Sequence, residues 1–475
     1  MIRALRLAAL ASLALAAVAC GGNAGGDDDT SKADASMPGT PDAARPDAEV
    51  PDPPDAQVDA EVPDNCGGVT SRCVDATHLE TCVNGNLVPT DCGAGSQVCK
   101  ADGAGGFGCF DAPLPGSFTV SGKVRYEDKE PLPSGALGAI TQKVARGVSV
   151  TVVADQGNTV LATGRTGDDG SYSLNYDTTA GAMVHVLAAT TSTLPSRPVK
   201  VVKSGGSIHG AASASFAAAA SVQMDILATN ASHLGPAFNI FDQFITAIDA
   251  VRVRMGVTGT LQPIKAFWQD GTTDGTYFNG DIHLLGAPDD DDGYDDAVML
   301  HEFGHYVEAR YGGTDSPGGG HNGSPTDPRL GWSEGWATYF QAAVRNHHFY
   351  MDSNAGGGFG QDLEAEVTKA QAAGAMTQNT SENMIAEILW DFGDGPAGDD
   401  DARAGGDRHE DVMKVQTAYL SGNLATRGVA GVDLVDWLDG WFKLQGLSTC
   451  AAGRMIVTTT HTFPYDFHAS GATCP

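Results

Sequence analysis

The stretch His301-Glu302-Phe303-Gly304-His305 is the most informative part of the chain, because it sets two histidines four residues apart. On a helix, side chains at this spacing lie one turn apart on one face, so both imidazoles can bind the same Zn²⁺ ion. A glutamate directly after the first histidine lies beside the open coordination position, where it can take a proton from metal-bound water. The stretch therefore predicts two zinc ligands, His301 and His305, and a general base, Glu302.

The flanking residues predict that this stretch lies on a helix of roughly four turns. Asp295 and Asp296 would occupy the first turn and Arg310 the last, and Gly312 lies just beyond the end. Acids at the start of a helix, a base near its end and a glycine after it are the usual marks of helix termini.

A zinc hydrolase also needs a third protein ligand and one coordination position left open for water. The candidate is Glu334, at the start of a second predicted helix over about Ser333–Asn346. The competing donors are Asp315, His321 and Asp327, in a segment rich in Gly, Pro and Asp that predicts a loop. A helix holds a ligand more rigidly than a loop does, which favours Glu334.

The chain resembles the gluzincin metallopeptidases, and most closely their fungalysin and thermolysin types, over roughly Phe238–Leu447. The segments that carry the resemblance are His301–His305, Trp332–Trp336, Ala386–Asp391 and Tyr277–Gly286. The resemblance implies an α+β zincin-like domain in which His301, His305 and Glu334 hold Zn²⁺. It also implies that Glu302 deprotonates the attacking water and that the substrate is a protein or peptide. The segment Tyr277–Gly286 is similar to the edge strand along which this group aligns the substrate backbone.

Two positions depart from those families. Thermolysin-like enzymes carry an aspartate four residues after the glutamate ligand, where it orients the first histidine, and this chain has Thr338 there. Fungalysins usually carry a glutamate where this chain has Asn383. The nearby acids Glu382, Glu387 and Asp391 are alternatives for orienting a ligand, and the sequence does not choose among them.

Enzymes of this group also use a histidine or tyrosine to donate a hydrogen bond to the oxyanion formed from the peptide carbonyl. His409, in the segment Gly405–Glu410, is the catalytic candidate for this role. The alternative is a solvent-facing loop histidine, which would have no part in catalysis.

The beginning of the chain predicts export. Arg3 and Arg6 precede the apolar run Leu7–Val18, which is too short to span a bilayer and is typical of a secretory signal. The stretch Ala17–Cys20 resembles the lipobox of bacterial lipoproteins, in which the cysteine is lipidated and becomes the mature N-terminus. Residues 1–20 are therefore expected to be a lipoprotein signal peptide, and the protein an outer-membrane lipoprotein at the cell surface or outside the cell. Ordinary signal cleavage nearby is the alternative.

Residues 21–65 are predicted to be a disordered acidic tether. They are rich in Pro, Asp, Ala and Gly and have almost no large apolar residues, a composition that cannot form a packed core. The formal net charge of the whole chain is −31, which argues against nucleic acid or an anionic surface as a partner. A lipid anchor is then the only membrane contact that the sequence predicts.

The chain has nine cysteines, of which six lie in 66–112 and two, Cys450 and Cys474, lie near the end. Even numbers in exported segments suit disulfides. The segment 66–112 is therefore predicted to be a disulfide module, and a zinc ribbon is the alternative. A disulfide between Cys450 and Cys474 would close a C-terminal segment that contains the strand-like Met455–Thr458.

Residues 113–230 are predicted to form an all-β sandwich. Apolar and polar residues alternate through Val120–Tyr126 and Val148–Val152, as they do in strands with one buried face. The phrase Thr166–Leu174 resembles the transthyretin-like modules attached to carboxypeptidases, which are structural or adhesive.

From Phe238 onward, apolar residues recur at spacings of three and four, which indicates an amphipathic helix followed by an α+β region. The zinc metallopeptidase-like domain is therefore expected to occupy 231–475. The predicted fold is multidomain, with a small disulfide-rich module, an all-β sandwich and an α+β zincin-like catalytic domain in this order.

The acidic run Asp289–Gly293 suits either a solvated helix start or a Ca²⁺ site. It does not match an EF-hand loop, because Pro288 and Met299 occupy positions that need carboxylates. Zn²⁺ is thus the expected cofactor, and Ca²⁺ is an open alternative.

The sequence favours a lipid-anchored, secreted zinc metallopeptidase. One alternative is a catalytically inactive surface-binding or adhesion lipoprotein with a zincin-like fold, which Thr338 and the two N-terminal modules favour. The other is a zinc hydrolase of a non-peptide substrate. Zinc content and hydrolysis of an unstructured protein distinguish the three.

Overall fold

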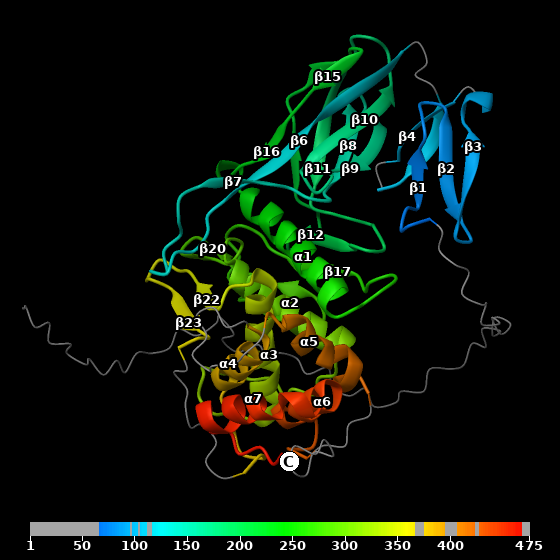
Figure 1. Ribbon diagram of the computed structural model, residues 1–475. Helices are drawn as coiled ribbons and strands as arrows, with labels where there is room; N and C mark the ends of the chain where they lie inside the picture. The colour runs from blue at the N-terminus through cyan, green and yellow to red at the C-terminus, as the bar shows by residue number, and fades with distance from the viewer. Residues whose placement is uncertain are drawn as a thin grey trace, which may run out of the picture.

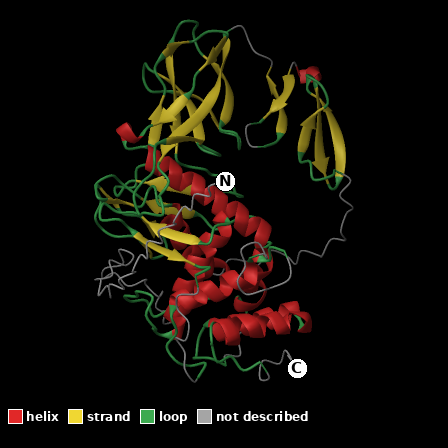
Figure 2. Cartoon of the chain, turned by 60° about the vertical axis from the view of Figure 1, so that its left-hand side comes forward, coloured by secondary structure: helices red, strands yellow, loops and turns green. Residues whose placement is uncertain are grey.

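A computed structural model describes residues 66–95, 97–102, 105–111, 116–365, 375–394, 406–422 and 427–467. Strands gather towards the N-terminal end of this part and helices towards its C-terminal end (Figures 1 and 2). The expectations for residues 1–65, including Cys20, and for Cys474 lie outside the described residues. Within the described part, none of the helices has the length and apolar character that crossing a bilayer requires.

The cysteine module consists of two small antiparallel β structures. The first contains β1 (Ser71–Cys73), β2 (His78–Val83) and β3 (Asn86–Asp91), and the second is the hairpin of β4 (Gln97–Ala101) and β5 (Phe107–Asp111); the 3-10 turn η1 (Gly93–Gly95) lies between them. Disulfides join Cys66 to Cys82, Cys73 to Cys99 and Cys92 to Cys109. The disulfide prediction is confirmed, and the zinc ribbon is wrong because metal binding needs free thiolates.

Residues 117–228 form two five-stranded sheets that share one apolar core. One sheet contains β6 (Ser117–Asp128), β7 (Thr141–Val144), β10 (Ser171–Asp177), β15 (Ser221–Gln223) and β16 (Ile226–Ala228). The other contains β8 (Ser149–Ala154), β9 (Val160–Arg165), β11 (Met183–Ala189), β13 (Gly210–Ala212) and β14 (Phe216–Ala217). Val120, Val124 and Tyr126 of β6 are fully buried between more exposed neighbours, so the predicted alternation is present.

A further sheet joins residues on both sides of the boundary expected at residue 230. Its strand order is β12 (Val199–Val202), β17 (Ile264–Phe267), β19 (Ile282–His283) and β18 (Tyr277–Phe278). β12 runs parallel to β17, with Val199 opposite Ile264. A strand from the expected sandwich range therefore belongs to the sheet of the following region, since alternation identifies a strand but not its partner. β18 lies at the edge of this sheet.

The long helix α1 (Gly235–Arg254) links the sandwich to the helical region (Figure 1). The four apolar positions that predicted it are all buried, namely Phe238, Phe241, Ile245 and Ile248. Asp242 of α1 accepts hydrogen bonds from Arg146 Nε at 2.8 Å and Nη2 at 3.0 Å, and from the Tyr126 hydroxyl at 3.2 Å. Apolar residues of the sandwich and of the helices belong to one continuous core, so the two regions are packed as one body.

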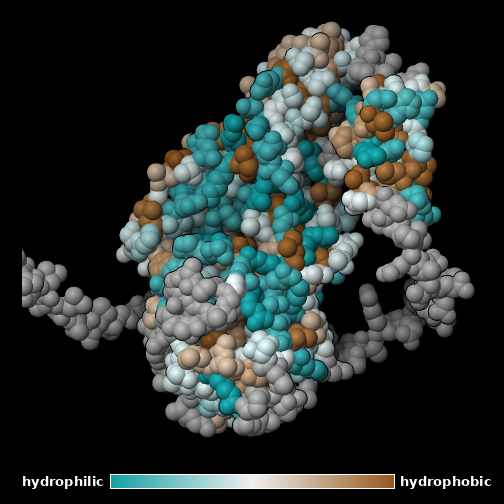
Figure 3. Space-filling view, viewed as in Figure 1, coloured by the Kyte–Doolittle hydropathy of each residue, from teal (hydrophilic) through white to brown (hydrophobic). Residues whose placement is uncertain are grey.

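The remaining helices are α2 (Asp296–Tyr311), α3 (Pro328–Arg345), α4 (Glu382–Gly393), α5 (His409–Val415), α6 (Leu434–Gln445) and α7 (Cys450–Arg454). Short hairpins are formed by β20 (Gly286–Ala287) with β21 (Asp290–Asp291), and by β22 (Phe349–Asp352) with β23 (Phe359–Asp362). Single turns of 3-10 helix are η2 (Asn230–Ser232) and η4 (Leu447–Thr449), and π-helical turns are η3 (Gln416–Leu420) and η5 (Met455–Thr460). On the face shown in Figure 3, hydrophilic residues predominate and apolar ones are scattered among them.

Two local expectations are wrong. The segment Met455–Thr458 is helical and not a strand, because Ile456 and Val457 are buried in the core while the chain continues the turn of α7. The second predicted helix, α3, begins at Pro328, before the expected Ser333, because the Asp327 side chain caps it by accepting from the Arg329 N–H at 3.0 Å. Glu334 therefore lies in the second turn of α3.

Cys450 is buried and disulfide-bonded. Its pairing with Cys474 stays a prediction.

Candidate metal centre

The helices α2 and α3 pack closely at a glycine. A Cβ atom at Gly304 would lie 2.8 Å from the Cα of Ala337 and 3.2 Å from the Cβ of Phe340, so only glycine permits this approach. Trp336 Nε1 donates a hydrogen bond to the Gly304 carbonyl at 3.2 Å. This contact sets the histidine-bearing face of α2 against the glutamate of α3.

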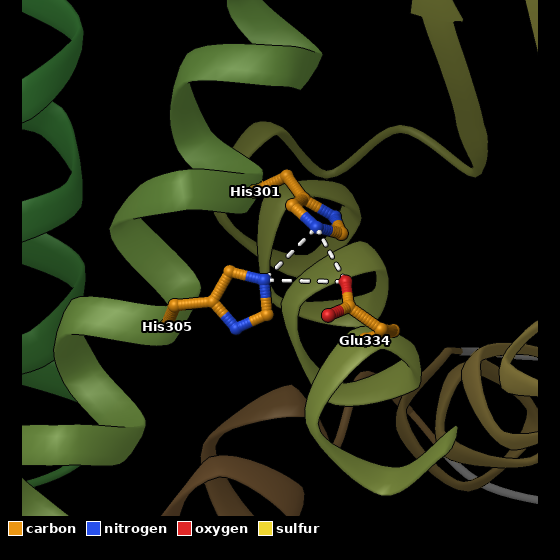
Figure 4. A group of neighbouring side chains, drawn as sticks. All are labelled: His301, His305 and Glu334. Carbon is orange, nitrogen blue, oxygen red and sulfur yellow. Dashed lines mark hydrogen bonds and ion pairs between the residues drawn. The ribbon is translucent and has the colours of Figure 1, made fainter. Parts of the chain in front are cut away.

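His301, His305 and Glu334 converge on one point between the two helices (Figure 4). Glu334 Oε2 lies 3.2 Å from His301 Nε2 and 3.3 Å from His305 Nε2, and the two Nε2 atoms are 3.2 Å apart. All three side chains are buried. The one donor atom that each offers lies within 4.8 Å of the others, and Glu302 contributes none of these atoms.

This donor set fits a zinc ion. Two imidazole nitrogens and one carboxylate oxygen are the ligands of many catalytic zinc sites, in which a fourth position is open to water. Burial alone would raise the pKa of Glu334, but the neighbouring histidines His321, His305 and His301 lower it well below its usual range. A lowered pKa favours the ionised carboxylate, which is the form that binds a metal.

A hydroxyl group contacts the Nδ1 atom of each imidazole, on the side of the ring away from Glu334. Thr338 Oγ1 lies 3.1 Å from His301 Nδ1, and Ser333 Oγ lies 3.3 Å from His305 Nδ1. Ser333 in turn donates to the carboxylate of Glu308 at 2.6 Å. A hydroxyl oxygen that accepts from Nδ1–H leaves Nε2 unprotonated and free to bind a metal. Thr338 and Ser333 are thus the residues that contact the Nδ1 atoms of the two histidines.

The arrangement on the side of His305 was not identified from the sequence. Glu308 lies one turn after His305 on α2 and is buried, and burial raises its pKa to about 7. The sequence does place Glu308 three residues after His305, a spacing that sets both side chains on one helix face.

A cavity opens beside the metal ligands and contains His321. It is lined by His301, His321, Asn322, Gly323, Glu334, Thr338, Tyr350, Phe359, Gln361, Glu382 and Asn383. His321 Nε2 lies 3.5 Å from Glu334 Oε2, and His321 Nδ1 lies 3.1 Å from Glu382 Oε2. Glu382 also accepts from the Gly323 N–H at 2.7 Å. His321 thus lies next to the three converging donors, with Nδ1 of its ring beside the Glu382 carboxylate.

The other acids considered as ligands or partners lie elsewhere. Asp327 caps α3, and Asp315 accepts from the Val432 N–H at 2.8 Å. Of the three acids of α4, Glu382 is the one that contacts the site. Asp391 pairs with His461 at 2.7 Å, and Glu387 lies 3.8 Å from the same ring.

His409 is buried at the start of α5. Its Nδ1 lies 3.0 Å from the Tyr339 hydroxyl, and its ring centroid lies 4.8 Å from that of Trp390. The solvent-facing alternative is therefore wrong. His409 is not among the residues that line the cavity, so a catalytic role for it stays a prediction without support from the geometry.

The acidic run before α2 is partly buried. Asp290 and Asp292 meet Asp352 of β22, and one oxygen of each carboxylate lies within 4.8 Å of the others. Burial and the neighbouring carboxylates of Asp352 and Asp295 raise the pKa of Asp292 well above its usual range, and burial raises that of Asp295 to about 8. The expectation of a solvated run is wrong here. Oxygen donors suit Ca²⁺, and calcium binding stays a prediction.

Residues 256–459 match the family model of the mycolysin C-terminal domain. The match includes the helices α2, α3 and α4 that form the candidate site, and it covers less than half of the chain. This part of the chain is therefore related to metallopeptidases.

The other comparisons add no argument about function. No curated protein sequence matches the chain significantly. The major plantain pollen allergen Pla l 1 is similar at 17% identity and a TM-score of 0.15, over 24% of this chain and 91% of the allergen. A 9R-lipoxygenase from Cyanothece PCC8801 is similar at 11% identity and a TM-score of 0.16, over 33% of this chain and 26% of the enzyme.

The hydroxyl of Thr338 is expected to support metal binding. Thr338→Val removes the acceptor for His301 Nδ1–H, so zinc affinity should fall by roughly 10-fold or more. Competition with a chromogenic chelator measures the affinity. Thr338→Ser keeps the hydroxyl and should bind zinc as the wild type does, and equal affinities for all three proteins would contradict this role.

The acid cluster is expected to make the protein less stable as the pH rises. Asp292 and Asp295 have raised pKa values in the fold, so between about pH 4 and pH 8 the folded state holds protons that the unfolded state has lost. Urea unfolding in a chelator should show stability falling over this range. Asp292→Asn should flatten the slope and raise the stability at pH 8, whereas the exposed-site control Asp289→Asn should change neither. Parallel slopes for Asp292→Asn and wild type would show that the cluster does not titrate this way.

Proposed function

We propose that this protein is a secreted zinc metallopeptidase in which His301, His305 and Glu334 hold the metal and Glu302 acts as general base. The observation that carries the proposal is the convergence of three buried donors from α2 and α3 on one point. The match of 256–459 to a metallopeptidase-related domain supports it independently. The three disulfides fit a protein that works outside the cytoplasm.

Bound zinc would lower the pKa of a water molecule towards neutrality and polarise the carbonyl of the scissile bond. Glu302, next to His301 on α2, would accept the proton of that water and later deliver it to the leaving amine. The hydroxyls of Thr338 and Ser333 would keep both imidazoles in the metal-binding tautomer.

His321 is the residue that we assign to the developing oxyanion, in place of His409. It lines the cavity beside the ligands, with Nδ1 near Glu382 and Nε2 near Glu334. As an imidazolium it would place one N–H on the Glu382 carboxylate and offer the other to the oxyanion. A donor that is already oriented in this way needs little rearrangement when negative charge develops on the substrate oxygen.

Replacing the base should separate metal binding from catalysis. Glu302→Gln should keep about one zinc per chain and lose activity on an unstructured protein by roughly 10²- to 10⁴-fold, because the carboxamide cannot take a proton. Metal analysis by mass spectrometry and peptide-bond cleavage measure the two properties. His301→Ala is the control and should lose both, while His321→Gln should keep the metal and lower kcat.

The alternatives give different results in the same experiment. A wild-type protein with zinc but no activity on any peptide would support a hydrolase of another substrate. A protein that binds no zinc would support the inactive surface-binding lipoprotein. Full zinc in Glu334→Ala with loss of zinc in His321→Ala would make His321 the third ligand and overturn the gluzincin assignment.

We also propose that Cys20 is the mature N-terminus and carries lipid, with residues 21–65 as the tether. The support is the basic start, the short apolar run and the small residues before Cys20. Intact mass of protein extracted from membranes should show a lipidated chain beginning at Cys20. A mature chain that begins elsewhere and partitions into the aqueous phase would refute the anchor without affecting the peptidase proposal.

A further inference from the structure

The loop between β6 and β7 of the sandwich touches the turn of the hairpin formed by β22 and β23 (Figure 1). A Cβ atom at Gly135 of the loop would overlap the carbonyl group of Gly357, and one at Gly358 would lie 2.9 Å from the Gly135 Cα. The two backbones therefore meet at a point where only glycine fits. Beside this point, the loop and the hairpin line a cavity of about 430 Å³, so the contact between them is local.

Hydrogen bonds and an ion-pair network give the loop a defined shape. Gly135 adopts a φ of +78°, and its N–H donates to the Leu132 carbonyl at 2.8 Å. At the base of the loop, Lys143 Nζ of β7 lies 2.8 Å from both Asp128 Oδ2 and Glu130 Oε1. Asp128 is fully buried, and an ion pair with a buried carboxylate is costly to break. The loop therefore presents Gly135 to the hairpin in a fixed position.

The two strands of the hairpin are anchored differently. The end of β22 is bound at the start of α2, because the N–H and the hydroxyl of Ser353 donate to the Asp295 carboxylate at 2.6 and 2.7 Å. Tyr350 of β22 is also buried against α2. β23 begins at Phe359, directly after Gly358, and Phe359 is 40% exposed. The start of β23 thus depends on its pairing with β22 and on the position of the turn that the sandwich loop touches.

The same hairpin forms a wall of the cavity beside the candidate metal ligands. Tyr350 of β22 and Phe359 of β23 both line that cavity. The Tyr350 ring centroid lies 6.0 Å from that of His301 and 6.1 Å from that of Phe359. A peptide whose carbonyl reached the metal would place a neighbouring side chain against these rings. The position of Phe359 would then set the space available to that side chain.

We infer that Gly135 of the sandwich is a positioning residue of the candidate active site. Its contact with the hairpin turn holds Phe359 at the cavity, and Phe359 determines which side chains of a peptide are accepted next to the scissile bond. The inference rests on the proposed peptidase function. Its physical basis is a continuous series of contacts, from the ion pairs at the base of the loop through two glycine backbones to the aromatic wall of the cavity.

The substrate preference of the full-length, zinc-loaded protein tests the inference. Two peptides are compared that differ only in one side chain next to the scissile bond, alanine in one and phenylalanine in the other. Gly135→Ala forces the hairpin turn away from the loop, so the ratio of the two kcat/KM values should change by about 5-fold or more, while the zinc content stays the same.

The matched control is Gly181→Ala, in a turn of the same sandwich. Gly181 has the same φ of +78° as Gly135, but a Cβ atom there would meet nothing within 4 Å. The control therefore adds the same backbone strain without moving the hairpin. It should leave the ratio of the two kcat/KM values unchanged.

Phe359→Ala tests the route by which Gly135 acts. Because Phe359 is 40% exposed, this variant should fold, and the wider cavity should raise kcat/KM for the phenylalanine peptide relative to the alanine peptide by about 5-fold or more. Adding Gly135→Ala to Phe359→Ala should then change the ratio no further, which a double-mutant cycle measures. Amide hydrogen exchange of Phe359–Asp362 reports on the hairpin independently of activity. It should be faster in Gly135→Ala than in the wild type or in Gly181→Ala.

The outcomes separate this inference from the proposed function. A wild type that binds zinc but cleaves no peptide would refute the peptidase, and with it the selectivity assigned to Phe359. In a wild type that cleaves peptides, an unchanged ratio in Gly135→Ala or Phe359→Ala, or an equal change in Gly181→Ala, would overturn the inference alone. Additive effects in the double variant, or unchanged hydrogen exchange in Gly135→Ala, would do the same.

Discussion

The close approach of α2 and α3 at Gly304 is the constraint on which the candidate site depends. A side chain at this position would collide with the backbone of Ala337 and force the two helices apart. His305 directly follows Gly304, and Glu334 lies three residues before Ala337, so the packing contact and the candidate metal ligands lie within about one turn of each other on both helices. The tight packing of the two helices therefore also fixes the positions of the donor atoms.

The position of His301 and His305 on one helix face could be predicted from sequence, because helix periodicity alone sets their relation. The partner of His301 could not, because the spacing identifies Thr338 as the facing residue but not whether a hydroxyl there suffices. In the structure Thr338 Oγ1 lies 3.1 Å from His301 Nδ1. His321 and Glu382 were recognised only as separate candidates, since they come from a glycine-rich loop and from α4, and only tertiary structure brings them together.

The errors have a common physical origin. Met455–Thr458 is rich in β-branched residues, which favours a strand locally, but burial of Ile456 and Val457 in the helical core overrides this preference. Val199–Val202 lies in the range expected for the sandwich, yet it pairs with β17 across the expected boundary. His409 follows a glycine-rich segment and so suggested an exposed loop, whereas its contacts with Tyr339 and Trp390 bury it. In each case long-range packing decided the outcome.

Buried charge is distributed unevenly, and the pattern separates structural groups from functional ones. Arg146, Arg197 and their aspartates neutralise one another inside the sandwich and at α1. At the metal centre, by contrast, Glu334 faces the histidines, and at the acid cluster Asp292 faces other carboxylates. Burying charged groups in this way costs free energy of folding unless the site takes up a cation or a proton. The candidate metal centre and the acid cluster are therefore two places in the described part of the chain where buried charge lacks an oppositely charged side chain of the kind that Arg146 and Arg197 have. At such places a bound ligand can balance the charge.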